Sequence, residues 1–338
     1  MRRLIIAGRV LLIAYILLAA IAAVAGWLLV PGILHPQNLS PDRLQQTTAM
    51  LLRTGATRED FNVRALDGVA LRGWKIRAAE PSGDWVLLFH GVSDNRTGML
   101  GAAGFLLLHG YSVVMMDARA HGASRGNMAT YGWKERYDTV AVTNALYSTE
   151  HVRHLFELGV SMGAAIALQS AAVEPRIEAV VAEDPFANLR EVAYDYAGLD
   201  FSPLLGKTLL RPAVITAMYS IRKLGGFNPD DVSPEKAVAQ RPFPVLLICG
   251  TEDHRIPCRH AERIYKAARG PRELWIVPGA SHAEALGRAY AEYERRVLQF
   301  FEASAHNSRD ETRKSRCGAV RSFECPSSRS GSYEPVEE

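Results

Sequence analysis

The chain contains little cysteine and almost no excess of charge. Its four cysteines in 338 residues are too few for a disulfide scaffold, and none has the CxxC or Cys/His spacing of a zinc site. The 39 basic and 36 acidic residues leave a net charge of +3, too weak a field to indicate nucleic-acid binding. Internal repeats are also absent. A composition with 48% hydrophobic residues indicates a globular protein, and nothing implies a metal or an organic cofactor.

The cysteines have separate interpretations. Cys249 ends an apolar stretch and is expected to be a small core residue, whereas the sequence gives Cys258 no evident role. Cys317 and Cys325 lie in a polar tail, where an oxidising compartment would allow them to pair.

Charge is also missing from a long N-terminal run. From Val10 to Val30 the chain is VLLIAYILLAAIAAVAGWLLV, long enough for a helix of about 20 residues that crosses a membrane. A cleaved signal peptide is the alternative, because Ala23-Val24-Ala25 resembles a cleavage site. The run continues beyond that site, which favours an anchor over residues 1–34. In both cases the basic N-terminus stays cytoplasmic and the rest of the chain is exported.

The remaining chain alternates between strand-like and helix-like segments. A polar connector at 35–59 precedes a hairpin around Asp67-Gly68. Six apolar runs follow, separated by segments of helical length: WVLLFH, YSVVMMD, HLFELGV, IEAVVAE, PVLLICG and ELWIVPG. Runs that are apolar on both faces are typical of parallel strands covered by helices on both sides. The sequence therefore predicts an α/β fold with a mostly parallel sheet over 60–302.

Two segments depart from this alternation. The segment of about 185–244 lacks strand signals, and its sequence indicates helices broken by Pro203, Pro212 and Gly225-Gly226. We interpret this segment as an apolar lid inserted between two core strands. After a last helix over about 283–305, the polar, Ser- and Arg-rich residues 303–338 are expected to form a disordered tail.

The segment Gly159-Val160-Ser161-Met162-Gly163 is the first sign of chemistry. A G-x-S-x-G pattern is weak evidence alone, but here a predicted strand precedes Ser161 and a predicted helix follows it. A strand, a sharp turn and a helix lift a nucleophilic serine above a sheet. Gly159 and Gly163 would give the tight turn its space. We therefore predict that Ser161 is a nucleophile.

A serine nucleophile needs a base and an acid that orients the base. Asp253 follows the strand PVLLICG, and His282 follows the next strand, ELWIVP. Both therefore lie at the sheet edge where Ser161 is expected. Glu252 remains an alternative acid, and two other histidines, His254 and His260, remain alternative bases.

Two backbone N–H groups are expected to stabilise the oxyanion of the tetrahedral intermediate. Met162 directly follows the nucleophile and supplies one of them. Val92 supplies the other, because the segment His90-Gly91 turns the chain after an early strand. His90 is expected to support this loop rather than to react.

The chain resembles the α/β-hydrolase superfamily in five segments. They are HGVSDNR at 90–96, DARAHGASRG at 117–126, GVSMG at 159–163, CGTEDHRIP at 249–257 and PGASH at 278–282. The likeness is greatest to its membrane-anchored bacterial esterase, lipase and peptidase-like branch. The resemblance implies a Ser161, Asp253 and His282 triad with Val92 and Met162 as oxyanion donors. It also implies structural roles for Asp117 and Arg119, while Ala120 stands where the family often has glycine.

The resulting hypothesis is a serine hydrolase that cleaves ester-type acyl bonds through an acyl-enzyme. Thioesterase and serine peptidase activities use the same machinery and remain open, as does a non-catalytic membrane-tethered binding protein. An anchor beside an apolar insertion favours lipid-like acyl substrates. Protein partners are not indicated.

Overall fold

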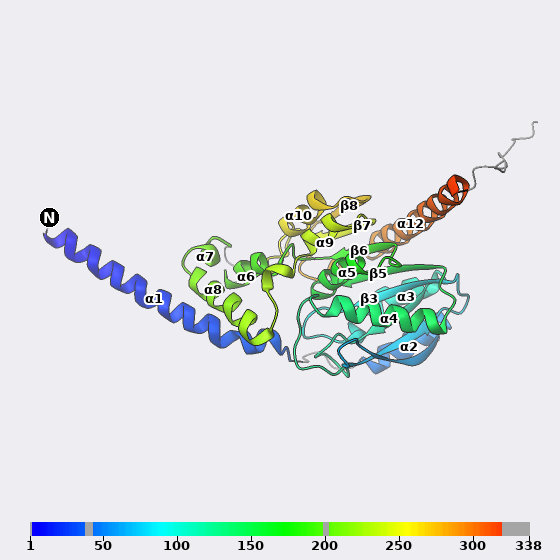
Figure 1. The fold of residues 1–338 in the computed structure, drawn as a ribbon, viewed down its shortest axis with the longest axis horizontal. Helices are drawn as coiled ribbons and strands as arrows, with labels where there is room; N and C mark the ends of the chain where they lie inside the picture. The colour runs from blue at the N-terminus through cyan, green and yellow to red at the C-terminus, as the bar shows by residue number, and fades with distance from the viewer. Residues whose placement is uncertain (1, 38–42, 199–202, 320–338) are drawn as a thin grey trace, which may run out of the picture.

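An eight-stranded, mostly parallel sheet forms the centre of the molecule, in the order β1-β2-β4-β3-β5-β6-β7-β8 (Figure 1). The computed structural model describes residues 2–37, 43–198 and 203–319. β1 and β2 form an antiparallel hairpin, β2 pairs antiparallel with β4, and the remaining neighbours are parallel. The strands are β1 (Thr57–Arg64), β2 (Ala70–Arg77), β3 (Asp84–Phe89), β4 (Ser112–Met116), β5 (His154–Val160), β6 (Ala179–Glu183), β7 (Val245–Gly250) and β8 (Arg272–Val277). The mostly parallel sheet predicted from the apolar runs is confirmed, and the arrangement is the α/β-hydrolase fold that the resemblance implied.

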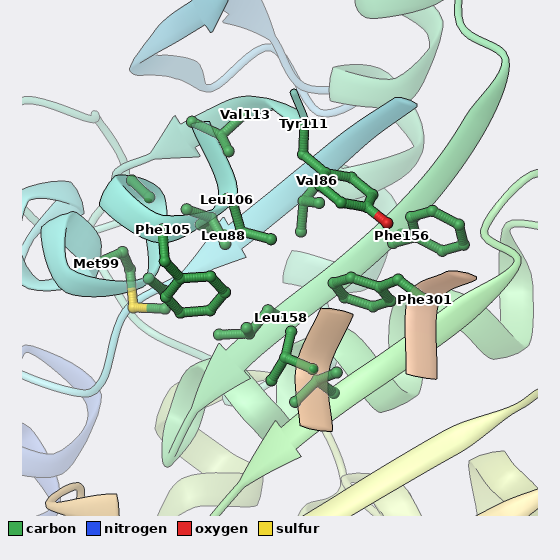
Figure 2. Close-up of a cluster of buried hydrophobic side chains, with 14 of the residues drawn as sticks. Val86, Leu88, Met99, Phe105, Leu106, Tyr111, Val113, Phe156, Leu158 and Phe301 are labelled. Carbon is green, nitrogen blue, oxygen red and sulfur yellow. The ribbon is translucent and has the colours of Figure 1, made fainter. Parts of the chain in front are cut away.

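Helices cover both faces of the sheet. On one face lie α3 (Leu100–Leu108), which follows the short η1 (Arg96–Met99), and α12 (Tyr290–Ala319); on the other lie α4 (Glu135–Thr149), α5 (Met162–Val173) and α10 (Arg259–Ala267). Figure 2 shows the first of these two cores, where the rings of Phe156 and Phe301 stack with centroids 4.6 Å apart. The four-residue α11 (Ala285–Arg288) joins the last strand to α12. Burial on both faces explains why the inner strands β3 to β7 are largely apolar, whereas the edge strands β1 and β8 are mostly exposed.

The predicted insertion is helical. It contains α6 (Leu189–Ala197), α7 (Pro203–Lys207), α8 (Arg211–Ser220), the π-helical turn η2 (Ile221–Gly225), η3 (Pro229–Asp231) and α9 (Pro234–Gln240). Its predicted bounds of about 185–244 agree with the segment between β6 and β7. Within that segment, Val238 of α9 packs into the core between the sheet and α5.

Two boundaries differ from the sequence predictions. The 35–59 connector contains α2 (Leu44–Thr54), whose buried Met50 packs into the core beside α3, and β1 begins at Thr57. Spacings of three and four residues between buried positions in α2 carried the missed helical signal. The tail predicted over 303–338 is wrong for 303–319, because α12 continues to Ala319 in a segment free of proline. Residues 320–338 lie outside the described residues.

The N-terminal α1 (Arg2–Leu34) extends away from the sheet (Figure 1). It is long and apolar enough to cross a membrane, a property that a signal sequence shares. Its last part packs against the insertion, with Val30 and Leu34 fully buried there.

Candidate active site

Ser161 lies in a sharp turn between β5 and α5. Its backbone is in the left-handed region, with φ 56° and ψ −117°, which is strained for a residue with a side chain. The N–H of Ser161 donates to the Glu183 carbonyl, 2.8 Å away, and its own carbonyl accepts from Ala165 in the first turn of α5. These two hydrogen bonds fix the turn to β6 and to α5. The predicted order of strand, turn and helix is confirmed for this segment.

The two glycines of the motif are required by space. A Cβ at Gly163 would lie 2.1 Å from the Phe89 carbonyl oxygen, and one at Gly159 would lie 2.3 Å from the Gly163 carbonyl oxygen. Both distances are far below van der Waals contact, so α5 could not pack this closely on β3 and β5 with larger residues. Gly91, by contrast, faces Ser161 Cβ at 3.7 Å, an ordinary contact.

Ser161, His282 and Asp253 form a continuous chain of hydrogen bonds. His282 Nε2 lies 2.9 Å from Ser161 Oγ, and His282 Nδ1 lies 2.7 Å from Asp253 Oδ2. Ser161 and Asp253 are buried, and His282 is partly buried. The other Asp253 oxygen accepts from the N–H groups of Arg255 and Ile256, at 2.8 and 2.9 Å, which fixes the carboxylate.

The structure places the alternative residues elsewhere. Glu252 and His254 are exposed on the same loop as Asp253. His260 is buried, and its Nε2 lies 2.6 Å from the Asp195 carboxylate of α6. His260 therefore ties the insertion to α10 and does not contact Ser161.

The surroundings of His282 favour its protonation. Burial opposes the charged form, but the hydrogen bond and the negative charge of Asp253 outweigh it and raise the pKa of His282 above 6.5. An imidazole with a raised pKa accepts a proton more readily than a free one.

Asp184 is a nearby acid that the sequence analysis missed. It directly follows β6, at φ 48°, and one oxygen lies 3.8 Å from His282 Nδ1. Its carboxylate accepts from the N–H groups of Gly250 and Ala283, so it joins the end of β7 to the residue after His282. Its place after a core strand, like that of Asp253, was the available signal. Burial and the neighbouring carboxyls raise the pKa of Asp184 to about 7.

Asp184, Asp253 and His282 bring potential metal-ligand atoms within 4.8 Å of one another, the one such group among the described residues. The ligand atoms are already used, because Asp253 Oδ2 and Ser161 bond the two ring nitrogens and backbone N–H groups bond Asp184. We therefore assign the group to the support of His282.

A cleft of about 420 Å³ opens beside Ser161. Val92, a predicted oxyanion donor, lines it, and Met162 is the first residue of α5, where an N–H has no intrahelical acceptor. The cleft wall includes the apolar Met99 and Ala102 beside α3, together with several charged side chains. Its other lining residues include Arg43, Asp94, Glu183, Tyr196, Arg255, Leu286 and Tyr293.

His90 supports the loop of Val92. Its Nδ1–H donates to the Gly91 carbonyl at 2.7 Å, and its Nε2 accepts from the Ala118 N–H at 3.0 Å. Burial, together with His121 nearby, lowers the pKa of His90 to about 4, so the ring stays neutral and keeps both bonds.

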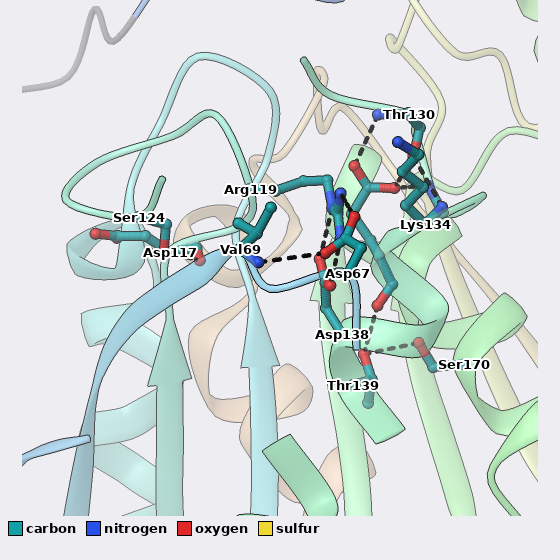
Figure 3. Close-up of polar contacts among 12 residues, drawn as sticks. Asp67, Val69, Asp117, Arg119, Ser124, Thr130, Lys134, Asp138, Thr139 and Ser170 are labelled. Atoms are coloured by element: carbon teal, nitrogen blue, oxygen red, sulfur yellow. Dashed lines mark hydrogen bonds and ion pairs between the residues drawn. The ribbon is translucent and has the colours of Figure 1, made fainter. Parts of the chain in front are cut away.

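The segment after β4 is held by ion pairs. Asp117 accepts from the N–H groups of Arg96 and Ala123, and Arg119 pairs with Asp138 and Asp67 (Figure 3). Ala120, where glycine was expected from the resemblance, has φ 60°, which explains that preference.

The structure also pairs Cys249 with Cys258, a disulfide that the sequence analysis did not predict. Cys249 is buried as expected, but it is not a free core thiol. The two Cα atoms lie 5.4 Å apart because the loop that carries Asp253 folds back on itself. A separation of nine residues in the sequence does not indicate that two cysteines are bonded. The bond closes the base of that loop.

We predict that Cys258→Ser lowers the free energy of unfolding by about 2–3 kcal/mol, because the open loop gains conformational freedom in the unfolded chain. Urea unfolding of wild type and variant, each with and without reductant, measures this. Reductant should destabilise only the wild type, and an unchanged wild-type midpoint would show that the cysteines are not bonded.

Residues 80–224 match the family model of serine aminopeptidase, S33. Among curated proteins, the chain is 28% identical to YqkD of Bacillus subtilis over 246 residues, covering 72% of this chain and 78% of that one. It is 26% identical to YfhR of Escherichia coli K12 over 258 residues, covering 74% and 82%.

Among solved structures, the esterase Pf2001 of Pyrococcus furiosus superimposes with a TM-score of 0.63 at 24% identity, covering 79% of this chain and 98% of that one. The similarity extends over nearly the whole of that protein and shows that the two proteins share a fold.

Proposed function

Because the chain is a member of the α/β-hydrolase superfamily, we propose that it is a serine hydrolase that cleaves ester-type acyl bonds. The observation that carries the proposal is the hydrogen-bonded chain from Ser161 through His282 to Asp253. Each member has a separate task, and the geometry suits the sequence of proton transfers that acyl transfer needs.

In the proposed reaction, His282 Nε2 removes the proton of Ser161 as Oγ bonds to the ester carbonyl carbon. The N–H groups of Val92 and Met162 stabilise the negative oxygen. His282 returns the proton to the leaving alcohol as the C–O bond breaks, which leaves an acyl-enzyme. Water then attacks with the same proton transfers, and the carboxylic acid and free Ser161 are released.

Peptide hydrolysis is the second candidate, because the matching family model describes serine aminopeptidases. An aminopeptidase must bind a free α-ammonium group, which calls for an unpaired carboxylate at the rim of its site. Among the acidic residues that line the cleft, Asp94 is paired with Arg43 and Glu183 is buried, with its oxygen bonded by the Ala285 N–H. Neither acid is free to bind an ammonium group, which favours esters over peptides with a free N-terminus.

A panel of p-nitrophenyl esters from acetyl to palmitoyl, with matched thioesters and aminoacyl p-nitroanilides, tests the reaction class. We expect the esters to give kcat/KM at least 100-fold above the anilides, and the medium-to-long acyl chains to give the lowest KM because the cleft wall at Met99 and Ala102 is apolar. Faster cleavage of the anilides would favour the peptidase. A folded protein that cleaves none of them would favour a binding protein.

We also propose that α1 is retained as a single-pass anchor, with its N-terminus cytoplasmic and the hydrolase domain outside the cytoplasm. Basic residues near the N-terminus set this direction. The Cys249–Cys258 disulfide suits an oxidising compartment. Ala23 and Gly26 both contact α8, so cleavage after Ala25 would divide a packed interface.

A further inference from the structure

The anchor helix and the insertion are packed together. α8 lies along the last third of α1 (Figure 1), and the Thr216 hydroxyl donates to the Ala23 carbonyl at 2.8 Å. A Cβ at Gly26 would lie 2.1 Å from the Ala213 carbonyl oxygen, so glycine here lets the two backbones touch. Small residues serve this purpose where helices associate within membranes.

The end of α1 is also fixed to the hydrolase domain. The Leu34 carbonyl accepts from the Ala129 N–H, and the Ile33 carbonyl accepts from the Tyr131 hydroxyl, both at 2.8 Å. The direction in which α1 leaves the domain is therefore set by bonds, not by a free linker. If α1 crosses a bilayer, the depth of α8 in that bilayer is set as well.

That depth follows from the length of α1. The uncharged run from Val10 to Val30 rises about 30 Å as a helix, close to the thickness of the hydrocarbon layer. Ala23, whose carbonyl accepts from the Thr216 hydroxyl of α8, lies about 10 Å along the helix from Val30. α8 therefore lies beside the part of α1 that occupies one leaflet.

The outer side of the insertion suits such a place. Ile215 and Tyr219 of α8 are 48% and 55% exposed, and Leu224 of η2 is 49% exposed. Exposed apolar side chains of this size, next to a span, indicate a membrane contact. We call these three residues the lipid face.

Cations limit the depth. The ammonium of Lys223 lies 5.7 Å from the Tyr219 ring centroid, and the neighbouring Arg222 is exposed. Both cations lie near the level of Leu34, where phosphate headgroups would lie. At the other end of α8, Lys207 pairs with Glu191, and Arg211 is exposed.

We propose that the lipid face rests in the headgroup and upper acyl region of the leaflet that α1 crosses, so that the partner of this surface is a phospholipid bilayer. α6 packs against α8 and carries Tyr196 into the lining of the cleft beside Ser161. The cleft thus receives acyl substrates from the same leaflet, a step that rests on the proposed hydrolase function.

Photo-crosslinking tests the membrane contact without any reference to catalysis. The full-length protein, with p-benzoyl-phenylalanine in place of Ile215 or Tyr219, is reconstituted in phosphatidylcholine vesicles that contain a clickable phosphatidylcholine. We expect lipid adducts at both positions and at Ile16 in α1, and none at Leu66, which is 74% exposed in the β1–β2 turn. Adducts at Ile16 alone, or a crosslink between two copies of the chain, would overturn the proposal.

A second experiment tests the supply of substrate. Ile215→Asp with Tyr219→Asp should lower hydrolysis of a long-chain ester embedded in vesicles at least ten-fold, with kcat/KM for soluble p-nitrophenyl acetate unchanged. Equal rates on the embedded ester in variant and wild type would refute delivery from the leaflet. Absence of all ester hydrolysis in wild type would refute the proposed function and leave the crosslinking result standing.

Discussion

Ser161→Ala is expected to reduce ester hydrolysis by about 10⁴- to 10⁶-fold, because removal of Oγ removes the atom that bonds to the acyl carbon. The remaining rate would come from binding and from the oxyanion donors. Steady-state hydrolysis of p-nitrophenyl esters by wild type and variant measures the loss.

The loss must be separated from unfolding. Alanine has the same Cβ as serine, so it leaves the strain of the turn at Ser161 unchanged. The melting temperature of the variant should therefore stay within a few degrees of wild type. Ser148→Ala is the matched control, since Ser148 is an exposed serine on α4. A Ser161→Ala protein that keeps a tenth or more of the wild-type activity would exclude Ser161 as nucleophile.

Asp253→Asn is expected to lower kcat by about 10⁴-fold at pH 8, because asparagine neither stabilises the imidazolium nor holds the ring in the required tautomer. Asp184 cannot replace Asp253, since it lies 3.8 Å from Nδ1 and is bonded by two backbone N–H groups. Glu252→Gln, on the same loop but exposed, should change kcat less than two-fold.

The pH dependence of kcat/KM in wild type and Asp253→Asn provides a second test of the role of Asp253. Catalysis needs neutral His282, whose pKa is raised above 6.5, so wild-type kcat/KM should fall as pH decreases through that raised value. Without the charge of Asp253, burial lowers the pKa of His282, and the residual activity of Asp253→Asn should fall only at a lower pH. An identical acidic limb in both proteins would show that Asp253 does not act on His282.

The strands and the loops that carry Ser161, Asp253 and His282 were predictable because they depend on local pattern. Ser161 and Asp253 each follow a strand that is buried on both faces and therefore apolar, and His282 follows the edge strand β8, whose last residues are still apolar. Gly159 and Gly163 were informative for a similar reason, since the turn leaves no space for a Cβ.

What the sequence did not reveal depends on contacts between distant segments or on the path of a loop. Cys249 and Cys258 meet because the Asp253 loop folds back, and Asp184 reaches His282 only once β6 and β8 are placed on either side of β7. The α1–α8 contact joins residues almost 200 positions apart, as in the bond from Thr216 to Ala23, so neither helix shows it alone.

The most direct measurement is intact-mass spectrometry of the protein after treatment with a fluorophosphonate, followed by peptide mapping. We expect one adduct per chain, located on Ser161, with a labelling rate that decreases as pH falls through the pKa of His282, and no adduct in Ser161→Ala. A folded wild-type protein that stays unlabelled, or an adduct that persists in Ser161→Ala, would contradict the assignment of Ser161 as the nucleophile.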